Sequence, residues 1–203
     1  MGFTSEITSS EPTLSGAFAR AKEEGRGALV VYTTAGHPDP DRGLETLLAL
    51  ADAGADVIEL GIPFSDPLAD GPTIQRSSFE MIEKGVDLAW ALALLRRFRD
   101  VRGTPIVVFS YLNPIMSYGV DAFLVDAREA GAQGVLVTDL PVGSDPVLER
   151  KFRDSPLDLI RLIAPTTKPE RIREISAGAG GFLYYVSRTG VTGARAELTG
   201  TLE

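Results

Sequence analysis

Two acidic residues stand where acid–base chemistry would need them, one inside an apolar strand and one in the loop that follows it. Glu59 lies between Ile58 and Leu60, and Asp70 lies eleven positions later, before Gly71. Burial raises the pKa of a carboxyl group, which suits a group that must donate and accept protons near neutral pH. Two carboxyl groups in different environments can then hold different protonation states. The pair therefore predicts acid–base chemistry at the carboxyl end of a strand.

Both residues also have purely structural interpretations. A glutamate within a strand can be a structural carboxylate that pairs with a lysine or with backbone N–H groups, because buried charges are usually paired. Asp70 before Gly71 is also typical of a turn. The two residues by themselves leave both interpretations open.

Short apolar runs alternate with longer amphipathic stretches along the chain. The runs are rich in Val, Ile and Leu without strict alternation, which is typical of strands buried on both faces. We expect six strands, at residues 28–34, 56–62, 105–111, 134–138, 157–164 and 181–187. The amphipathic stretches predict helices at residues 14–24, 41–53, 88–101, 120–130 and 169–176, several of them followed by a glycine.

This alternation predicts an α/β fold with a parallel sheet built from βαβ units. A closed barrel and an open doubly wound sheet both fit, but no Gly-x-Gly-x-x-Gly follows the first strand, and polar residues follow several different strands. We therefore expect a single domain over residues 1–203 of the TIM (β/α)8 barrel family. It should be truncated after about six βα units, because a complete barrel has eight strands and about 250 residues.

Composition narrows the functional classes. The chain has 20 Lys and Arg against 28 Asp and Glu, a net charge of −8, whereas a nucleic-acid-binding surface needs clustered positive charge. It has no cysteine, which excludes disulfides and thiolate metal sites and makes a reducing cytoplasm the simplest location. No apolar run approaches the ~18–20 residues of a membrane span, and residues 1–12 lack the apolar stretch of a signal peptide. With one histidine and no His/Asp ligand spacing, we expect no metal site.

A longer motif surrounds the two carboxyl groups. Residues 59–75 have the sequence Glu-Leu-Gly-Ile-Pro-Phe-Ser-Asp-Pro-Leu-Ala-Asp-Gly-Pro-Thr-Ile-Gln, which closely resembles the signature of tryptophan synthase alpha chains over seventeen consecutive positions. Later segments resemble the same family: Tyr-Leu-Asn-Pro at 111–114, Tyr-Gly at 118–119, Thr-Asp-Leu-Pro at 138–141, Ala-Pro-Thr-Thr at 164–167, and Tyr-Tyr-Val-Ser-Arg-Thr-Gly-Val-Thr-Gly at 184–193. The resemblance covers essentially the whole chain after the first dozen residues.

What the resemblance implies is a lyase of tryptophan biosynthesis, which cleaves indole-3-glycerol phosphate to indole and glyceraldehyde 3-phosphate in a retro-aldol reaction. Glu59 would be the general acid and base that protonates indole C3, and Asp70 would stabilise the positive charge near the ring N–H. No cofactor or metal is expected, because indole itself accepts the electrons of the breaking bond. The residues that match the apolar wall around the indole are Tyr184, Tyr32, Phe109, Leu136 and Ile163.

The Gly- and Thr-rich loop at residues 188–193 closes over the substrate in the family. Thr192 would then hydrogen-bond to Asp70, and the N–H of Gly193 would reach the substrate phosphate, while closure excludes water. Composition alone is equally typical of a lid, an anion-binding loop and an ordinary surface loop. In the family, the main phosphate-binding loops follow the seventh and eighth strands. We therefore expect this chain to be a fragment, and its sequence leaves open whether it is active by itself.

The resemblance also implies a protein partner. In the family the alpha chain binds a beta chain that carries pyridoxal phosphate, in an α2β2 heterotetramer, and indole passes between the two. The contact would include the loop at residues 63–68, with Pro63 and Asp66, and residues 113–116. Two other functions remain open: a non-catalytic fragment that binds the beta chain, and another sugar-phosphate barrel enzyme, such as an isomerase, which would act on substrates without an indole ring.

Overall fold

The computed structural model describes residues 12–186 of the chain. Six strands form one sheet in which every neighbouring pair is parallel and the strand order follows the chain. They are β1 (Val30–Thr34), β2 (Val57–Gly61), β3 (Ile106–Ser110), β4 (Gly134–Val137), β5 (Asp158–Ile163) and β6 (Leu183–Tyr185). A doubly wound sheet reverses its strand order at a switch point, and this sheet does not. The expectation of a TIM-barrel fold is therefore confirmed, with six parallel strands in the described part of the chain.

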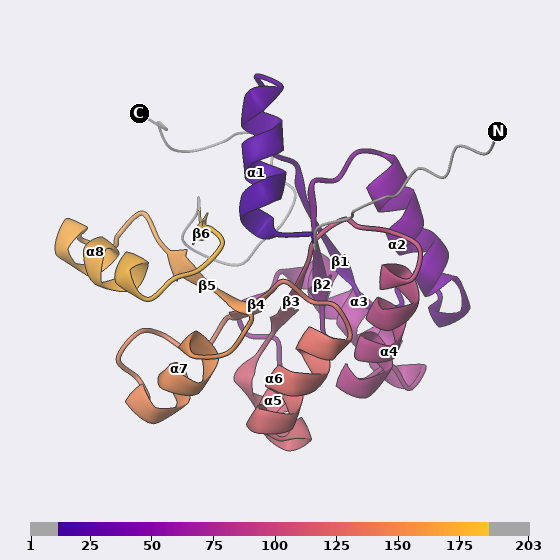
Figure 1. Cartoon of the computed structure of the whole chain (residues 1–203). Helices are drawn as coiled ribbons and strands as arrows, with labels where there is room; N and C mark the ends of the chain where they lie inside the picture. Colours follow the sequence, from indigo (N-terminus) through magenta and orange to yellow (C-terminus); the bar gives the residue numbers. More distant parts are fainter. Residues whose placement is uncertain (1–11, 187–203) are drawn as a thin grey trace.

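The helices lie mainly along one side of the strands. Figure 1 shows α1 across the strands from α4, α5, α6 and α7. The helices are α1 (Leu14–Glu23), the 3-10 helix η1 (Pro40–Arg42), α2 (Gly43–Asp52), α3 (Pro72–Glu83), α4 (Leu88–Arg99), α5 (Leu112–Tyr118), α6 (Val120–Glu129), α7 (Pro146–Arg153) and α8 (Pro169–Ala177). None of the helices in this described part of the chain is long and apolar enough to cross a membrane.

Three of these helices, α3, α5 and α7, were not predicted from the sequence. Each has a short or mostly polar sequence, and α5 also contains Pro114, so the apolar periodicity is weak. Each is nevertheless anchored by one fully buried apolar side chain, Met81, Ile115 or Phe152. Packing against the sheet thus decides their conformation, as is usual for helices of this length.

Alternation along the strands separates two apolar clusters. The outer cluster lies between the sheet and the helices and includes Ile58 and Leu60 of β2. The inner cluster contains Val57, Val107, Leu136 and Ile160 from four strands, together with Leu14 and Ala17 of α1. Leu14 lies near Gly134, the first residue of β4, and near Gly181, two positions before β6. Helix α1 therefore covers the inner face near the amino ends of the strands and leaves their carboxyl ends for the site.

An ion pair between the buried Asp56 and the more exposed Arg26 fixes the start of β2. Asp56 accepts hydrogen bonds from Nη1 and Nη2 of Arg26, at 2.5 and 2.8 Å, and from the backbone N–H of Leu29 at 2.8 Å. The Arg26 guanidinium lowers the pKa of the Asp56 carboxyl to about 2. These bonds join the segments before β1 and β2, and in the resulting register Tyr32 lies opposite Glu59.

Candidate active site

Glu59 occupies the middle of β2, with Tyr32 of β1 and Val107 of β3 as its neighbours in the sheet. By strand alternation it shares the inner face with Val57 of the inner cluster. Only 3 % of Glu59 is exposed, and its Oε1 atom has no hydrogen-bond partner among the described residues. Burial raises its pKa to about 7. Desolvation is the sole cause of this rise, and no lysine or arginine of residues 12–186 forms an ion pair with Glu59, so Glu59 is not an ion-paired structural carboxylate within this part of the chain.

Asp70 lies in the loop between β2 and α3 and has a different environment. Its Oδ2 atom accepts a hydrogen bond from the Tyr111 hydroxyl at 3.1 Å, and that hydroxyl accepts one from the backbone N–H of Ala69 at 2.8 Å. Burial raises the pKa of Asp70, and the hydrogen bond from Tyr111 opposes this rise. The Tyr111 hydroxyl therefore attaches two residues of this loop, Ala69 and Asp70, to the end of β3.

Tyr111 was not identified as a site residue from the sequence. It follows β3 directly and is almost completely buried, and its ring packs against that of Phe64 with 5.2 Å between the centroids. A buried tyrosine usually needs a partner for its hydroxyl, which is the signal that could have indicated a contact with a polar loop. Which loop it contacts depends on tertiary structure, so the sequence pattern alone did not specify Asp70.

The negative charges of the two carboxyl groups raise the pKa of the same two tyrosines, Tyr32 and Tyr184. Burial raises the pKa of Tyr32 to about 12, and the negative charges of Asp70 and Glu59 add to that rise. The pKa of Tyr184 is raised by the same causes, burial first and then the charges of Glu59 and Asp70. Strands β1, β2 and β6 and the β2–α3 loop thus bring these four residues into one electrostatic neighbourhood.

An apolar and aromatic surface adjoins Glu59. The ring of Tyr32 meets that of Phe109 edge to face, with centroids 5.3 Å apart and an interplanar angle of 81°. Leu136 is fully buried in the inner cluster, and Phe109 and Tyr184 pack against that cluster. Four of the residues expected around the indole are therefore on the inner face. They lie beside a buried carboxyl group, which is a suitable arrangement for a flat aromatic ligand with one site of protonation.

The fifth expected residue, Ile163, is not brought to this surface. It is the last residue of β5 and pairs with Tyr185, whereas the preceding residue, Leu162, pairs with Tyr184 and packs against the inner cluster. Because successive side chains of a strand point to opposite faces, Leu162 holds the inward position. Thr192 and Gly193 lie outside the described residues.

The segments expected at a partner contact lie on the same side as the site. Asp66 is exposed and accepts a hydrogen bond from the Ser65 hydroxyl at 2.5 Å, whereas Pro63 is buried. Residues 113–116 belong to α5. Two large apolar side chains are exposed in these segments, Leu68 at 87 % and Met116 at 61 %. Within the described part of the chain, no three His, Asp or Glu side chains gather in a way that could hold a metal ion.

Gly61 provides the space for Tyr32. A Cβ atom at position 61 would lie 2.1 Å from the Tyr32 hydroxyl oxygen and 2.5 Å from Cζ, and Phe109 limits how far that ring can move. We predict that Gly61→Ala costs about 1–3 kcal/mol of unfolding free energy, as overpacked sites do. In a Tyr32→Ala background the same substitution should cost far less, because the clashing atoms are gone. Urea unfolding of the four chains measures both costs, and an equal cost in the two backgrounds would contradict this packing.

The buried carboxyl of Glu59 should make stability depend on pH. Its folded-state pKa of about 7 exceeds the ordinary value of 4.5, so its stabilising proton is fully bound below about pH 4.5 and is lost as the pH rises through 7. We predict that Glu59→Gln, which is neutral at every pH, gains up to about 3 kcal/mol over the unsubstituted chain between pH 4 and pH 8.5. Urea unfolding at both pH values tests this, with the exposed Glu83→Gln as the control. A Glu59→Gln difference that does not change with pH would refute the burial of this charge.

Comparison with known proteins places this arrangement in a family. A family model described as tryptophan synthase alpha chain matches residues 18–203. The tryptophan synthase alpha chain of Burkholderia ambifaria is 51 % identical over 178 residues, which are 87 % of this chain and 66 % of that protein. This chain therefore spans just under two thirds of the length of that curated relative.

Solved structures agree with the sequence comparison. A structure of Mycobacterium tuberculosis tryptophan synthase matches with a TM-score of 0.84 and 36 % identity, over 92 % of this chain and 72 % of that one. A second structure comes from a study of mutual activation in the tryptophan synthase α2β2 complex of Pyrococcus furiosus. It matches with a TM-score of 0.73 and 43 % identity, over 78 % of this chain and 67 % of that one. The fold and the sequence from residue 18 onward agree: the chain belongs to the tryptophan synthase alpha chain family.

Proposed function

We propose that this protein cleaves indole-3-glycerol phosphate to indole and glyceraldehyde 3-phosphate, with Glu59 as the general acid and base. The observation that carries the proposal is the desolvated Glu59 carboxyl, whose Oε1 has no partner among the described residues and whose pKa is raised to about 7. Such a group is populated in both protonation states near neutral pH, which is what a residue that donates and then accepts a proton requires.

The reaction needs two proton transfers. Neutral Glu59 donates its proton to C3 of the indole ring, which becomes an indoleninium cation. The resulting carboxylate takes the proton of the glycerol hydroxyl next to the bond to be broken. As that oxygen forms a carbonyl, the electrons of the C–C bond return to the ring, and indole and glyceraldehyde 3-phosphate separate. The protons and electrons balance without an external oxidant or reductant, so we propose that this chain needs no cofactor.

Asp70 has the complementary role in this proposal. Its carboxylate stabilises the positive charge that develops at the ring N–H. Its environment supports the division of labour, because Asp70 accepts a hydrogen bond from Tyr111 while Glu59 Oε1 accepts none from residues 12–186. We also propose that the indole packs against Tyr32, Phe109, Leu136 and Tyr184. Thr192 then bonds to Asp70 and Gly193 to the phosphate when the loop at residues 188–193 closes.

Replacing Glu59 tests the acid–base assignment. Glu59→Gln keeps the size of the side chain but removes its proton transfer, so we predict that kcat for indole release falls about 10²–10⁴-fold. Glu83→Gln, on the exposed end of α3, is the matched control and should leave kcat unchanged. Release of indole from indole-3-glycerol phosphate is the assay. Unchanged turnover by Glu59→Gln would remove Glu59 from the mechanism, and turnover of sugar phosphates that lack an indole ring would favour an isomerase instead.

We further propose that this chain binds a tryptophan synthase beta chain, which carries the pyridoxal phosphate, in an α2β2 assembly in the cytoplasm. The similar structure from Pyrococcus furiosus concerns the α2β2 complex of tryptophan synthase. The exposed side chains of Leu68 and Met116 support a contact in the segments that contain Asp66 and residues 113–116, since isolated apolar side chains this exposed gain from burial.

A charge introduced at Met116 tests this contact. Met116→Glu places an unpaired carboxylate in the proposed interface, and we predict at least a tenfold rise in the Kd for the beta chain. Val147→Glu on α7, at a site of similar exposure (72 % against 61 %), is the control and should bind normally. Isothermal titration of each variant with the beta chain gives the Kd. Equal affinity for both variants would place the contact elsewhere.

A further inference from the structure

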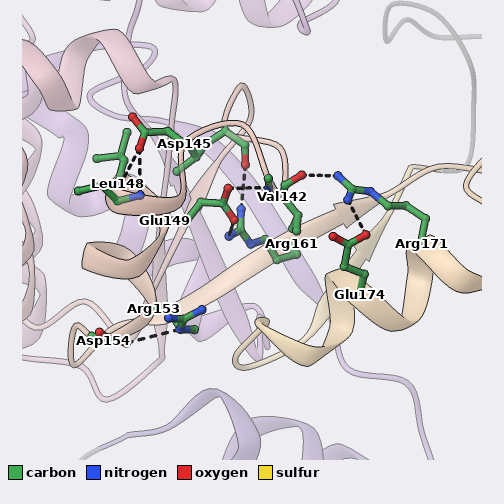
Figure 2. Close-up of polar contacts among 12 residues, drawn as sticks. Val142, Asp145, Leu148, Glu149, Arg153, Asp154, Arg161, Arg171 and Glu174 are labelled. Carbon is green, nitrogen blue, oxygen red and sulfur yellow. Dashed lines mark hydrogen bonds and ion pairs between the residues drawn. The ribbon is translucent and has the colours of Figure 1, made fainter.

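A buried ion pair on the outer face of the sheet is not explained by the proposed reaction. Arg161 of β5 and Glu149 of α7 lie 3.0 Å apart, between Nη2 and Oε2, and their side chains are only 8 % and 12 % exposed. Figure 2 shows the two side chains facing each other between β5 and α7. Removing two charges from water costs about as much as their attraction returns, so stability alone is a weak reason for such a pair.

The remaining polar atoms of the pair hold the loop between β4 and α7. Nη1 of Arg161 donates to the backbone carbonyl of Leu140 at 2.8 Å, and Oε1 of Glu149 accepts from the backbone N–H of Gly143 at 2.6 Å. Arg171 of α8 donates to the carbonyl of Val142 from the other side (Figure 2). Three backbone groups within four residues are therefore held by side chains from β5, α7 and α8.

The same loop is connected to the candidate site. Oδ1 of Asp139, next to Leu140, accepts a hydrogen bond from the backbone N–H of Leu112 at 2.7 Å. Leu112 directly follows Tyr111, whose hydroxyl donates to Asp70 and accepts from Ala69. A continuous series of hydrogen bonds and adjacent residues therefore runs from the buried pair to the second carboxyl group of the site.

We propose that the Arg161–Glu149 pair is a positioning device for Asp70, which acts through Leu140, Asp139 and Tyr111. Arg161 and Glu149 do not touch the substrate in this proposal; they fix where the Tyr111 hydroxyl lies, and with it the Asp70 carboxylate. The catalytic consequence rests on the proposed function. An error of about 1 Å in the placement of a catalytic group can cost about 10²-fold in rate, so a rigid support for Asp70 has a measurable effect.

The test replaces the pair by apolar residues of similar length. Arg161→Met combined with Glu149→Met removes the hydrogen bonds to Leu140 and Gly143, and it leaves no single buried charge unpaired. The control is Arg153→Met combined with Asp154→Met, which removes an exposed pair with a 3.5 Å separation at the end of the same helix. Figure 2 shows this second pair away from the β4–α7 loop.

Amide hydrogen exchange measures the positioning without any need for activity. We expect the N–H groups of Ala69 and Leu112 to exchange at least tenfold faster in the chain that carries Arg161→Met and Glu149→Met. They should exchange at the original rate in the control, while the amides of β2 stay protected in both chains. Unchanged protection of Ala69 and Leu112 would overturn the proposal.

A second variant covers the case in which the double substitution loosens the whole sheet. Asp139→Ala removes the side chain that accepts the hydrogen bond from the Leu112 N–H. Asp139 is exposed, and its substitution leaves Arg161 and Glu149 in place. It should accelerate exchange at Ala69 and Leu112 by a similar factor. If Ala69 keeps its protection in Asp139→Ala, the series of contacts does not support Asp70 and the proposal fails.

Kinetics then test the link to catalysis. With indole-3-glycerol phosphate and the beta chain, we expect the double substitution Arg161→Met, Glu149→Met to lower kcat about tenfold and to change KM less. In a chain that already carries Asp70→Asn, the same double substitution should not lower kcat further. An equal fall in both backgrounds would show that the pair does not act through Asp70. If the unsubstituted complex releases no indole, the proposed function fails, and the exchange rates still decide the positioning.

Discussion

The desolvation of Glu59 is the constraint on which the candidate site depends. A carboxyl group in the middle of a strand, next to apolar side chains, opposes folding whenever it is ionised. The chain offsets this cost with apolar clusters on both faces of the sheet and with the Asp56–Arg26 pair at the start of the same strand. The pair fixes one end of β2, and the clusters fix its sides, so Glu59 cannot turn toward water without disturbing the sheet. A buried ionisable group is thus kept in place by the packing and the ion pair of the strand that carries it.

The two carboxyl groups of the site are positioned in different ways. Glu59 is held by a strand, so its orientation follows from the register of β1, β2 and β3. Asp70 lies on a loop, and its position depends on Tyr111 from the next βα unit. A loop allows adjustment that a strand does not, and it therefore needs support from outside its own sequence. The hydrogen bonds around Tyr111 and Asp139 supply that support and explain why neighbouring loops are interdependent here.

The sequence predicted the strands well because most of them are dense runs of β-branched and aliphatic residues, and it predicted Glu59 because one acidic residue interrupts such a run in β2. It did not predict Gly61 as the space for Tyr32, nor Tyr111 as the partner of Asp70, since both depend on which strands are neighbours. The Arg161–Glu149 pair was missed for the same reason: twelve residues separate the two, and only the β5–α7 packing brings them together. Ile163 matched a family position by its place in the motif, whereas strand alternation gives the inward position to Leu162.

The order of the strands has a consequence for how the protein is made. Each strand pairs with the one synthesised just before it, so no contact in the described sheet waits for a distant part of the chain. Tyr32, Glu59, Asp70, Phe109 and Tyr111 all come from the first three strands and the loops that follow them. During synthesis on the ribosome, which delivers the amino end first, the part of the candidate site that contains Glu59 and Asp70 can assemble before β4, β5 and β6 have left the exit tunnel.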